Sequence, residues 1–83
     1  MTFYCPRTRD RAIQWDEHNL STIMETVLNW GYPLTFTVNL RQPGLLVIEE
    51  CGVAVRGDWL VEHNRVLQLW KEALFAETYR RCE

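Results

Sequence analysis

The sequence is short of positive charge. Its 83 residues include nine basic and eleven acidic side chains, which gives a formal net charge of −2. Lysine is nearly missing, since Lys71 is the only one and the other eight basic residues are arginine. A protein that binds the phosphate backbone of nucleic acid usually has a basic excess. The composition therefore argues against a general nucleic-acid-binding protein. It does not exclude a local basic surface.

Long apolar runs are also missing. No segment approaches the roughly 18 apolar residues of a membrane span, and the first residues contain no apolar stretch of the kind found in secretion signals. The three cysteines, Cys5, Cys51 and Cys82, are widely separated and odd in number. Secreted disulfide scaffolds usually have an even set at closer spacing. We therefore expect a cytoplasmic protein with reduced thiols and no membrane partner.

The residues that serve metal sites and catalysis are too scattered to form a recognisable motif. The cysteines and the two histidines, His18 and His63, each stand more than ten residues from the next. A structural zinc site usually takes two ligands from one short loop. Cys51 with His18 or His63 is the only nucleophile and base that can be paired, and no glycine-rich phosphate loop is present. We expect no metal, no cofactor and no enzymatic activity.

What the sequence does have is the composition of one folded domain over residues 1–83, with 47% hydrophobic and 24% charged residues. Four Trp, three Tyr and three Phe are many for a core of this size, so we expect some aromatic side chains at a surface. Residues 1–15 alternate in character around Arg7, Arg9 and Arg11 and are interrupted by Pro6. This pattern predicts an extended arm or an edge strand.

Helical periodicity is clear in residues 16–30. Apolar residues recur there at intervals of three and four: Leu20, Ile23, Met24, Val27 and Leu28. Asp16 fits the N-cap of this helix, and Gly31 fits its left-handed C-terminal position. A second, longer helix is predicted over residues 58–81, with Asp58 as its cap and most of its apolar residues on one broad face. Asn64 allows a break in that helix.

Strand patterns lie between these two helices. Residues 34–40 alternate between apolar and polar side chains, and residues 45–50 and 53–56 follow after turns at Pro43–Gly44 and Cys51–Gly52. The fold class expected from these patterns is α+β. It consists of a two- to three-stranded antiparallel sheet with both helices on one face.

Three apolar residues point away from the expected core face of the second helix: Val61, Phe75 and Tyr79. Exposed aromatic residues at helical spacing are typical of a helix that binds a partner, or of a homodimer interface. The alternative is that residues 1–15 fold back and cover them. An acidic pair, Glu49 and Glu50, offers a second surface for a protein partner with a basic groove.

An alternative partner is nucleic acid. In an extended segment Arg7, Arg9 and Arg11 share one side and can grip phosphates, and Arg80 and Arg81 can join them. The acidic balance of the chain favours a protein partner over DNA. The sequence thus predicts a small non-enzymatic protein-interaction module, of the accessory, regulatory or inhibitor type that phages and mobile elements encode. Its alternative is a DNA-binding regulator that uses the arginine arm.

Overall fold

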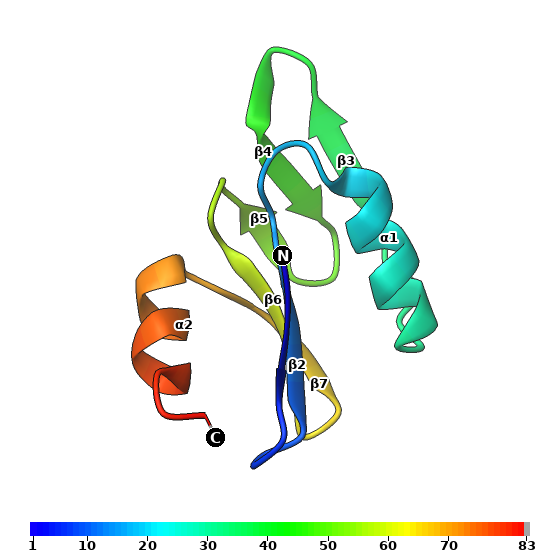
Figure 1. Cartoon of the computed structure of the whole chain (residues 1–83). Coiled ribbons are helices and arrows are strands. Elements are labelled where there is room, and N and C mark those ends of the chain that lie inside the picture. The colour runs from blue at the N-terminus through cyan, green and yellow to red at the C-terminus, as the bar shows by residue number, and fades with distance from the viewer. Residues whose placement is uncertain (83) are drawn as a thin grey trace.

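The computed structural model describes residues 1–82 and contains seven strands and two helices there (Figure 1). In chain order they are β1 (Thr2–Cys5), β2 (Asp10–Gln14), α1 (Leu20–Asn29), β3 (Phe36–Asn39), β4 (Gln42–Ile48), β5 (Gly52–Ala54), β6 (Trp59–His63), β7 (Val66–Trp70) and α2 (Glu72–Tyr79). The strands form two antiparallel sheets, a four-stranded sheet in the order β1-β2-β6-β7 and a three-stranded sheet in the order β3-β4-β5.

The predicted fold class, one two- to three-stranded sheet with both helices on one face, is wrong. The main error is the predicted helix over 58–81, because its first half forms the hairpin β6–β7 and only Glu72–Tyr79 is helical. The backbone of Asn64 and Arg65 explains the hairpin. Both have positive φ, 50° and 63°, as the two central residues of a type I′ hairpin turn require. Asn64 therefore marks a reversal of the chain and not a helix break.

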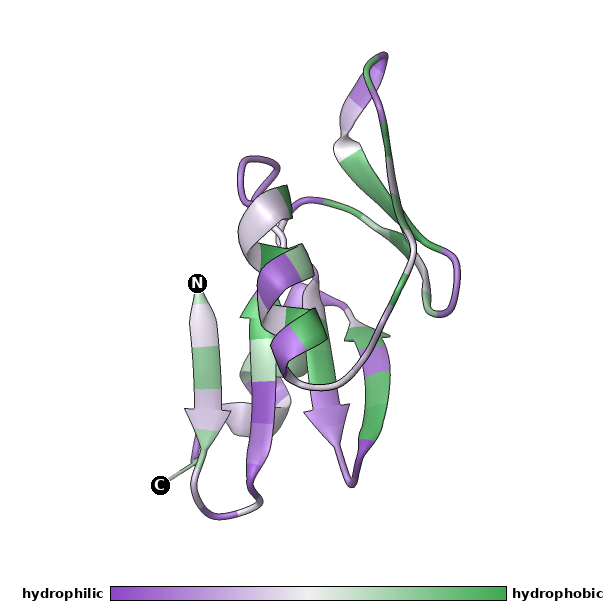
Figure 2. Ribbon diagram, turned by 90° about the vertical axis from the view of Figure 1, so that its right-hand side faces the viewer, coloured by the Kyte–Doolittle hydropathy of each residue, from purple (hydrophilic) through white to green (hydrophobic). Residues whose placement is uncertain are grey.

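The two helices lie on opposite faces of the four-stranded sheet, as Figure 1 shows. Alternate residues of the central strands β2 and β6 point to opposite sides. Ile13 and Leu60 belong to the core cluster that includes α1, whereas Ala12 and Val61 belong to the cluster that includes α2. Figure 2 looks onto the side that α1 covers. The central strands are thus covered on both faces, and their apolar residues are buried whichever face they point to.

The first helix begins at Leu20, four residues later than predicted. Asp16 does not cap it, because its carboxylate accepts the backbone N–H of His18, and the Asn19 side chain accepts the N–H of Asp16. These bonds close a tight loop before the helix. At the other end Gly31 has a φ of 97°, and the Tyr32 N–H donates to the Val27 carbonyl over 3.1 Å, which closes the helix as its sequence indicates.

The predicted strands 34–40, 45–50 and 53–56 correspond to β3, β4 and β5 with shifted ends. The chain reverses at Leu40–Arg41, so Pro43 and Gly44 lie inside β4. The inner face of this smaller sheet presents Leu46 and Ile48 to the core beside α1.

The segment after α2 is linked to the first strand. A disulfide joins Cys5, at the end of β1, to Cys82, just beyond α2, with the two Cα atoms 5.6 Å apart. The expectation of reduced thiols is therefore wrong for this pair, while Cys51 keeps a free thiol. The two cysteines are distant in sequence, so only the fold could show that they are neighbours. Neither helix of the described chain is long and apolar enough to cross a membrane.

Candidate functional site at the arginine-rich end of the sheet

Most of the basic side chains gather at one end of the four-stranded sheet. This end is built from the β1–β2 turn, the adjacent β6–β7 turn and the last residues after α2, which lie together at the bottom of Figure 1. It contains the five arginines singled out from the sequence and one more: Arg7, Arg9, Arg11, Arg65, Arg80 and Arg81. We call it the arginine-rich end.

Among residues 1–82, five of these six guanidinium groups have no acidic partner. Among residues 1–82 the ion pairs are Arg11 with Glu62, His63 with Asp10, and Lys71 with Asp58. The other arginines of this end, unlike Arg11, are exposed to solvent. Arginine without an internal partner is available for bidentate bonds to an external anion.

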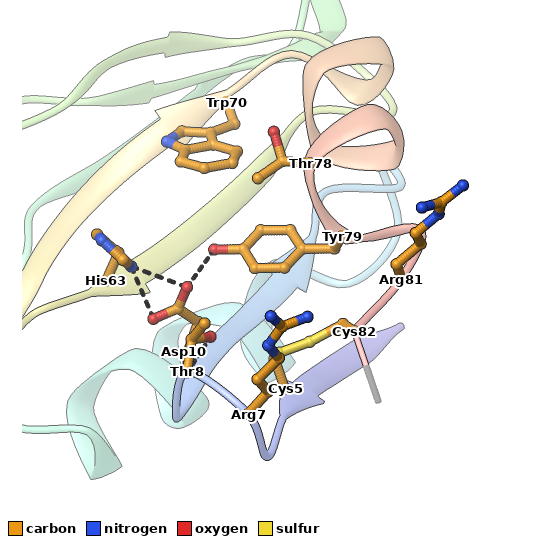
Figure 3. A pocket seen from close by; sticks show the side chains of 10 residues that line it. All are labelled: Cys5, Arg7, Thr8, Asp10, His63, Trp70, Thr78, Tyr79, Arg81 and Cys82. Atoms are coloured by element: carbon orange, nitrogen blue, oxygen red, sulfur yellow. Dashed lines mark hydrogen bonds and ion pairs between the residues drawn. A yellow bond between two sulfur atoms is a disulfide. The ribbon is translucent and has the colours of Figure 1, made fainter.

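A pocket of about 420 Å³ opens on the α2 side of this end (Figure 3). Its lining combines the disulfide with charged, hydroxyl and aromatic groups: Cys5, Arg7, Thr8, Asp10, His63, Trp70, Thr78, Tyr79, Arg81 and Cys82. Figure 3 shows the Asp10 carboxylate between His63 and Tyr79. The Tyr79 hydroxyl donates to Asp10 Oδ2 over 2.6 Å, and His63 Nδ1 lies 2.8 Å from both carboxylate oxygens.

These hydrogen bonds set the charge of the pocket. Burial by itself raises the pKa of Asp10, but the bonds from Tyr79 and His63 outweigh it and hold that pKa below its ordinary value. Burial first, and then the bond to Asp10, raise the pKa of Tyr79 well above the usual range. Asp10 is therefore an ionised carboxylate at neutral pH, satisfied by internal donors and orienting the His63 ring.

A second hollow, of about 680 Å³, opens at the same end on the α1 side. Here the Arg11 guanidinium lies 5.0 Å from the centre of the Trp30 ring and pairs with Glu62. The Tyr32 hydroxyl also donates to Glu62, over 2.6 Å. Although burial raises the pKa of Glu62, its bonds from Arg11 and Tyr32 lower it overall. Arg9 and Arg65 also line this hollow, so arginines without an ion-pair partner among residues 1–82 lie there beside aromatic side chains.

Backbone geometry sets two of these arginines apart. Arg9 and Arg65 have φ values of 62° and 63°, in the left-handed region that glycine adopts at lower cost. Each closes one of the two adjacent hairpins that form the arginine-rich end. Arginine in place of glycine at both turns favours a role for the side chains themselves.

The residues expected to bind a protein partner lie inside the molecule. Val61, Phe75 and Tyr79 are 0%, 7% and 8% exposed. The Phe75 ring stacks on Trp59 with centroids 3.9 Å apart and meets Phe3 edge-on at 5.1 Å. These three side chains were expected to point away from the core only because residues 58–81 were predicted to form one continuous helix. Because Val61 instead belongs to β6, all three lie between α2 and the sheet.

The acidic pair belongs to the smaller sheet. Glu49 and Glu50 are exposed in the turn between β4 and β5, where the Glu50 carboxylate accepts the backbone N–H of Thr35 over 3.1 Å. Neither residue lines the two hollows of the arginine-rich end.

The surroundings of Cys51 and His63 bear on the residues considered for a metal site or a nucleophilic mechanism. Within residues 1–82 no three His, Cys, Asp or Glu side chains converge as metal ligands do. The Cys51 thiol lies 3.9 Å from the Leu67 carbonyl, and burial raises its pKa, which disfavours the reactive thiolate. The His63 ring is bonded to Asp10 and contacts the Asn64 side chain.

Sequence reasoning missed Asp10, His63 and Arg65 as parts of this site. Asp10 and His63 are 53 residues apart and meet because β2 pairs with β6. The one local signal was Asn64–Arg65 between two apolar runs, which indicates a hairpin turn.

Comparison of the chain with known protein families, curated proteins and solved structures finds no match.

Proposed function

We propose that this protein is a non-enzymatic nucleic-acid-binding protein, with an accessory or regulatory role, and that the arginine-rich end contacts the phosphate backbone. The observation that carries the proposal is the convergence of five arginines, from three separate segments, that have no ion-pair partner among residues 1–82. Guanidinium groups bind phosphate oxygens bidentately, and several such contacts together fix the orientation of a nucleic acid.

The net charge of −2 does not oppose this proposal once the charges are placed. Two acidic residues, Asp10 and Glu62, line the hollows of the arginine-rich end, and both are engaged by internal donors. The local surface is therefore basic although the chain as a whole is acidic. Screening by salt limits the repulsion from acidic groups more than roughly 10 Å away.

The test is a fluorescence anisotropy titration of labelled 20-nucleotide single strands and 20-base-pair duplexes. We expect dissociation constants of about 1–100 µM at physiological salt, because unspecific backbone binding lies in this range. With three to five phosphate contacts, the logarithm of the association constant should fall with the logarithm of salt at a slope of roughly −2 to −4.5. Absence of binding to both probes at 50 mM salt would overturn the proposal.

A pair of charge-matched variants locates the surface. Arg9→Glu/Arg65→Glu reverses two charges at the arginine-rich end, and we expect affinity to fall more than tenfold. The control, Arg41→Glu/Arg56→Glu, reverses two exposed charges in the β3–β4 turn and before β6. Its affinity should change less than threefold, since it has the same net charge but leaves the site intact. Equal losses in both variants would mean that the arginine-rich end is not the binding surface.

A second candidate function, binding of a protein partner, has an observation of its own. Met24 and Leu28, one turn apart on α1, are largely exposed and border an apolar hollow with Pro33 and Phe36. Neighbouring apolar residues on an exposed helix are typical of a partner surface or a homodimer contact. Sedimentation of the protein with and without Met24→Glu/Leu28→Glu tests this: a dimer that the double variant abolishes would support it.

A cytoplasmic location is a further proposal, based on the sequence. In a reducing compartment such as the cytoplasm, Cys5 and Cys82 would be kept as neighbouring thiols and would not form the disulfide.

A further inference from the structure

The α1-side hollow continues along the edge of the sheet. A neighbouring hollow of about 440 Å³ shares three lining residues with it, namely Tyr4, Arg11 and Trp30. The two hollows together form one groove between the edge strand β1 and the end of α1. We call it the β1–α1 groove.

An exposed aromatic ring stands in the middle of this groove. Tyr4 is 57% exposed and is the direct cross-strand neighbour of Arg11. Arg11 in turn lies over Trp30, which is half-buried. The ion pair with Glu62 holds the Arg11 guanidinium group in place. Arg11 and Trp30 therefore form a floor of one guanidinium plane and one aromatic plane. Tyr4 has no aromatic neighbour within the described chain, whereas Phe3, beside it in sequence, packs against three rings.

The edges of the same groove are basic. Arg9 and Arg65 line its larger part, and neither has an ion-pair partner among residues 1–82. Aromatic rings between unpaired arginines are the combination by which proteins bind single strands, since the rings stack with bases while the cations contact the backbone. In a duplex the bases are stacked inside and the phosphates face outward. A ring on the floor of a concave groove can therefore meet only a base that has left the stack.

We infer that the nucleic acid is single-stranded and that the β1–α1 groove receives its bases, with one base stacked on Tyr4 and the adjoining phosphates on Arg9 and Arg65. This inference rests on the function proposed above. It adds the class of nucleic acid and names Tyr4 as the residue that distinguishes a single strand from a duplex.

The experiment compares Tyr4→Ala and Tyr4→Phe with the unaltered protein. The probes are a 20-nucleotide single strand, its duplex, and an abasic strand of equal length that keeps the backbone and lacks the bases. Because Tyr4 is exposed, both variants should unfold at the same temperature as the unaltered protein. We expect Tyr4→Ala to weaken single-strand binding about 5- to 50-fold, and Tyr4→Phe, which keeps the ring, to change it less than threefold.

The abasic strand isolates the stacking contribution. It should bind the unaltered protein as weakly as the normal strand binds Tyr4→Ala, and Tyr4→Ala should not weaken its binding further. A duplex that binds as tightly as the single strand, or Tyr4→Ala with unchanged single-strand affinity, would overturn the inference while the proposed function stands. Failure of both normal probes to bind would overturn the proposed function as well.

Discussion

The carboxylate of Asp10 is buried and accepts bonds from two side chains that follow it by more than fifty residues, His63 and Tyr79. An ionised group in such a place is tolerated only when its hydrogen-bond capacity is satisfied. Asp10 thereby ties the end of α2 to β2 and β6, and holds the wall of the pocket that adjoins the disulfide. Its role at the site is to position other groups, because its oxygens are already occupied.

Acid should remove the contribution of Asp10 to stability. The pKa of Asp10 is depressed in the folded state, so its ionised form stabilises the fold above the unfolded pKa of about 4. That contribution is lost as the pH falls through the folded value. We expect the free energy of unfolding, measured by urea titration, to fall more steeply for the unaltered protein than for Asp10→Asn as the pH is lowered below the unfolded pKa. Equal slopes would show that Asp10 is not the group involved.

A second residue-scale prediction concerns Arg65. Its φ of 63° favours glycine, so Arg65→Gly should raise the free energy of unfolding by about 0.5–1 kcal/mol. The same variant should weaken single-strand binding several-fold, because it removes an unpaired cation from the β1–α1 groove. Denaturant titration and anisotropy measure the two effects. A variant that is more stable and binds equally well would show that Arg65 serves only the turn.

At the scale of elements, α2 depends on its packing. It spans only Glu72–Tyr79, which is too short for a helix to persist alone in water. Phe75 stacks on Trp59 of β6, and Tyr79 stacks on Trp70 of β7, with ring centroids 5.5 Å apart. Five of the ten aromatic residues therefore form the layer between this helix and the sheet, namely Phe3, Trp59, Trp70, Phe75 and Tyr79.

Removing one ring of that layer should destabilise the domain. Phe75→Ala should lower the free energy of unfolding by about 3–5 kcal/mol, as is usual for a buried phenylalanine. The control is its neighbour Leu74, which is 53% exposed, and Leu74→Ala should cost less than about 0.5–1 kcal/mol. Thermal unfolding followed by circular dichroism measures both. An unchanged melting temperature for Phe75→Ala would contradict the buried position of this ring.

At the scale of the whole molecule, the disulfide closes nearly the entire chain, since Cys5 and Cys82 are separated by 77 residues. Chain-entropy arguments give a loop of this length about 4.5 kcal/mol of stabilisation, relative to the reduced protein. We expect dithiothreitol, or Cys5→Ser/Cys82→Ser, to lower the urea midpoint correspondingly, and Cys51→Ser to leave the effect of dithiothreitol intact. Three titratable thiols in the oxidised, unfolded protein would contradict the disulfide.

Local patterns predicted those elements whose signals depend on near neighbours. The apolar spacing in residues 20–28 and Gly31 gave the first helix and its end, and the alternation after Leu34 gave the strands of the smaller sheet. The run from Trp59 to Trp70 was misread because the strands of a sheet buried on both faces have apolar residues on both sides, which also suits a helix. Five arginines of the site could be singled out from the sequence. That the fold brings them close to Arg65 and His63 could not be predicted.

The sequence by itself determined the kinds of side chain available to this protein: arginine as nearly its only cation, many aromatic rings, and no motif for catalysis or a metal. Only the tertiary structure decided which of these face solvent. Pairing of β2 with β6 turned Val61 inward and brought two arginine-bearing turns together, and the packing of α2 on the sheet buried Phe75 and Tyr79. Strand pairing joins residues about fifty positions apart, and the free energy that selects it comes from burying both faces of the sheet at once. No local window of sequence contains that information.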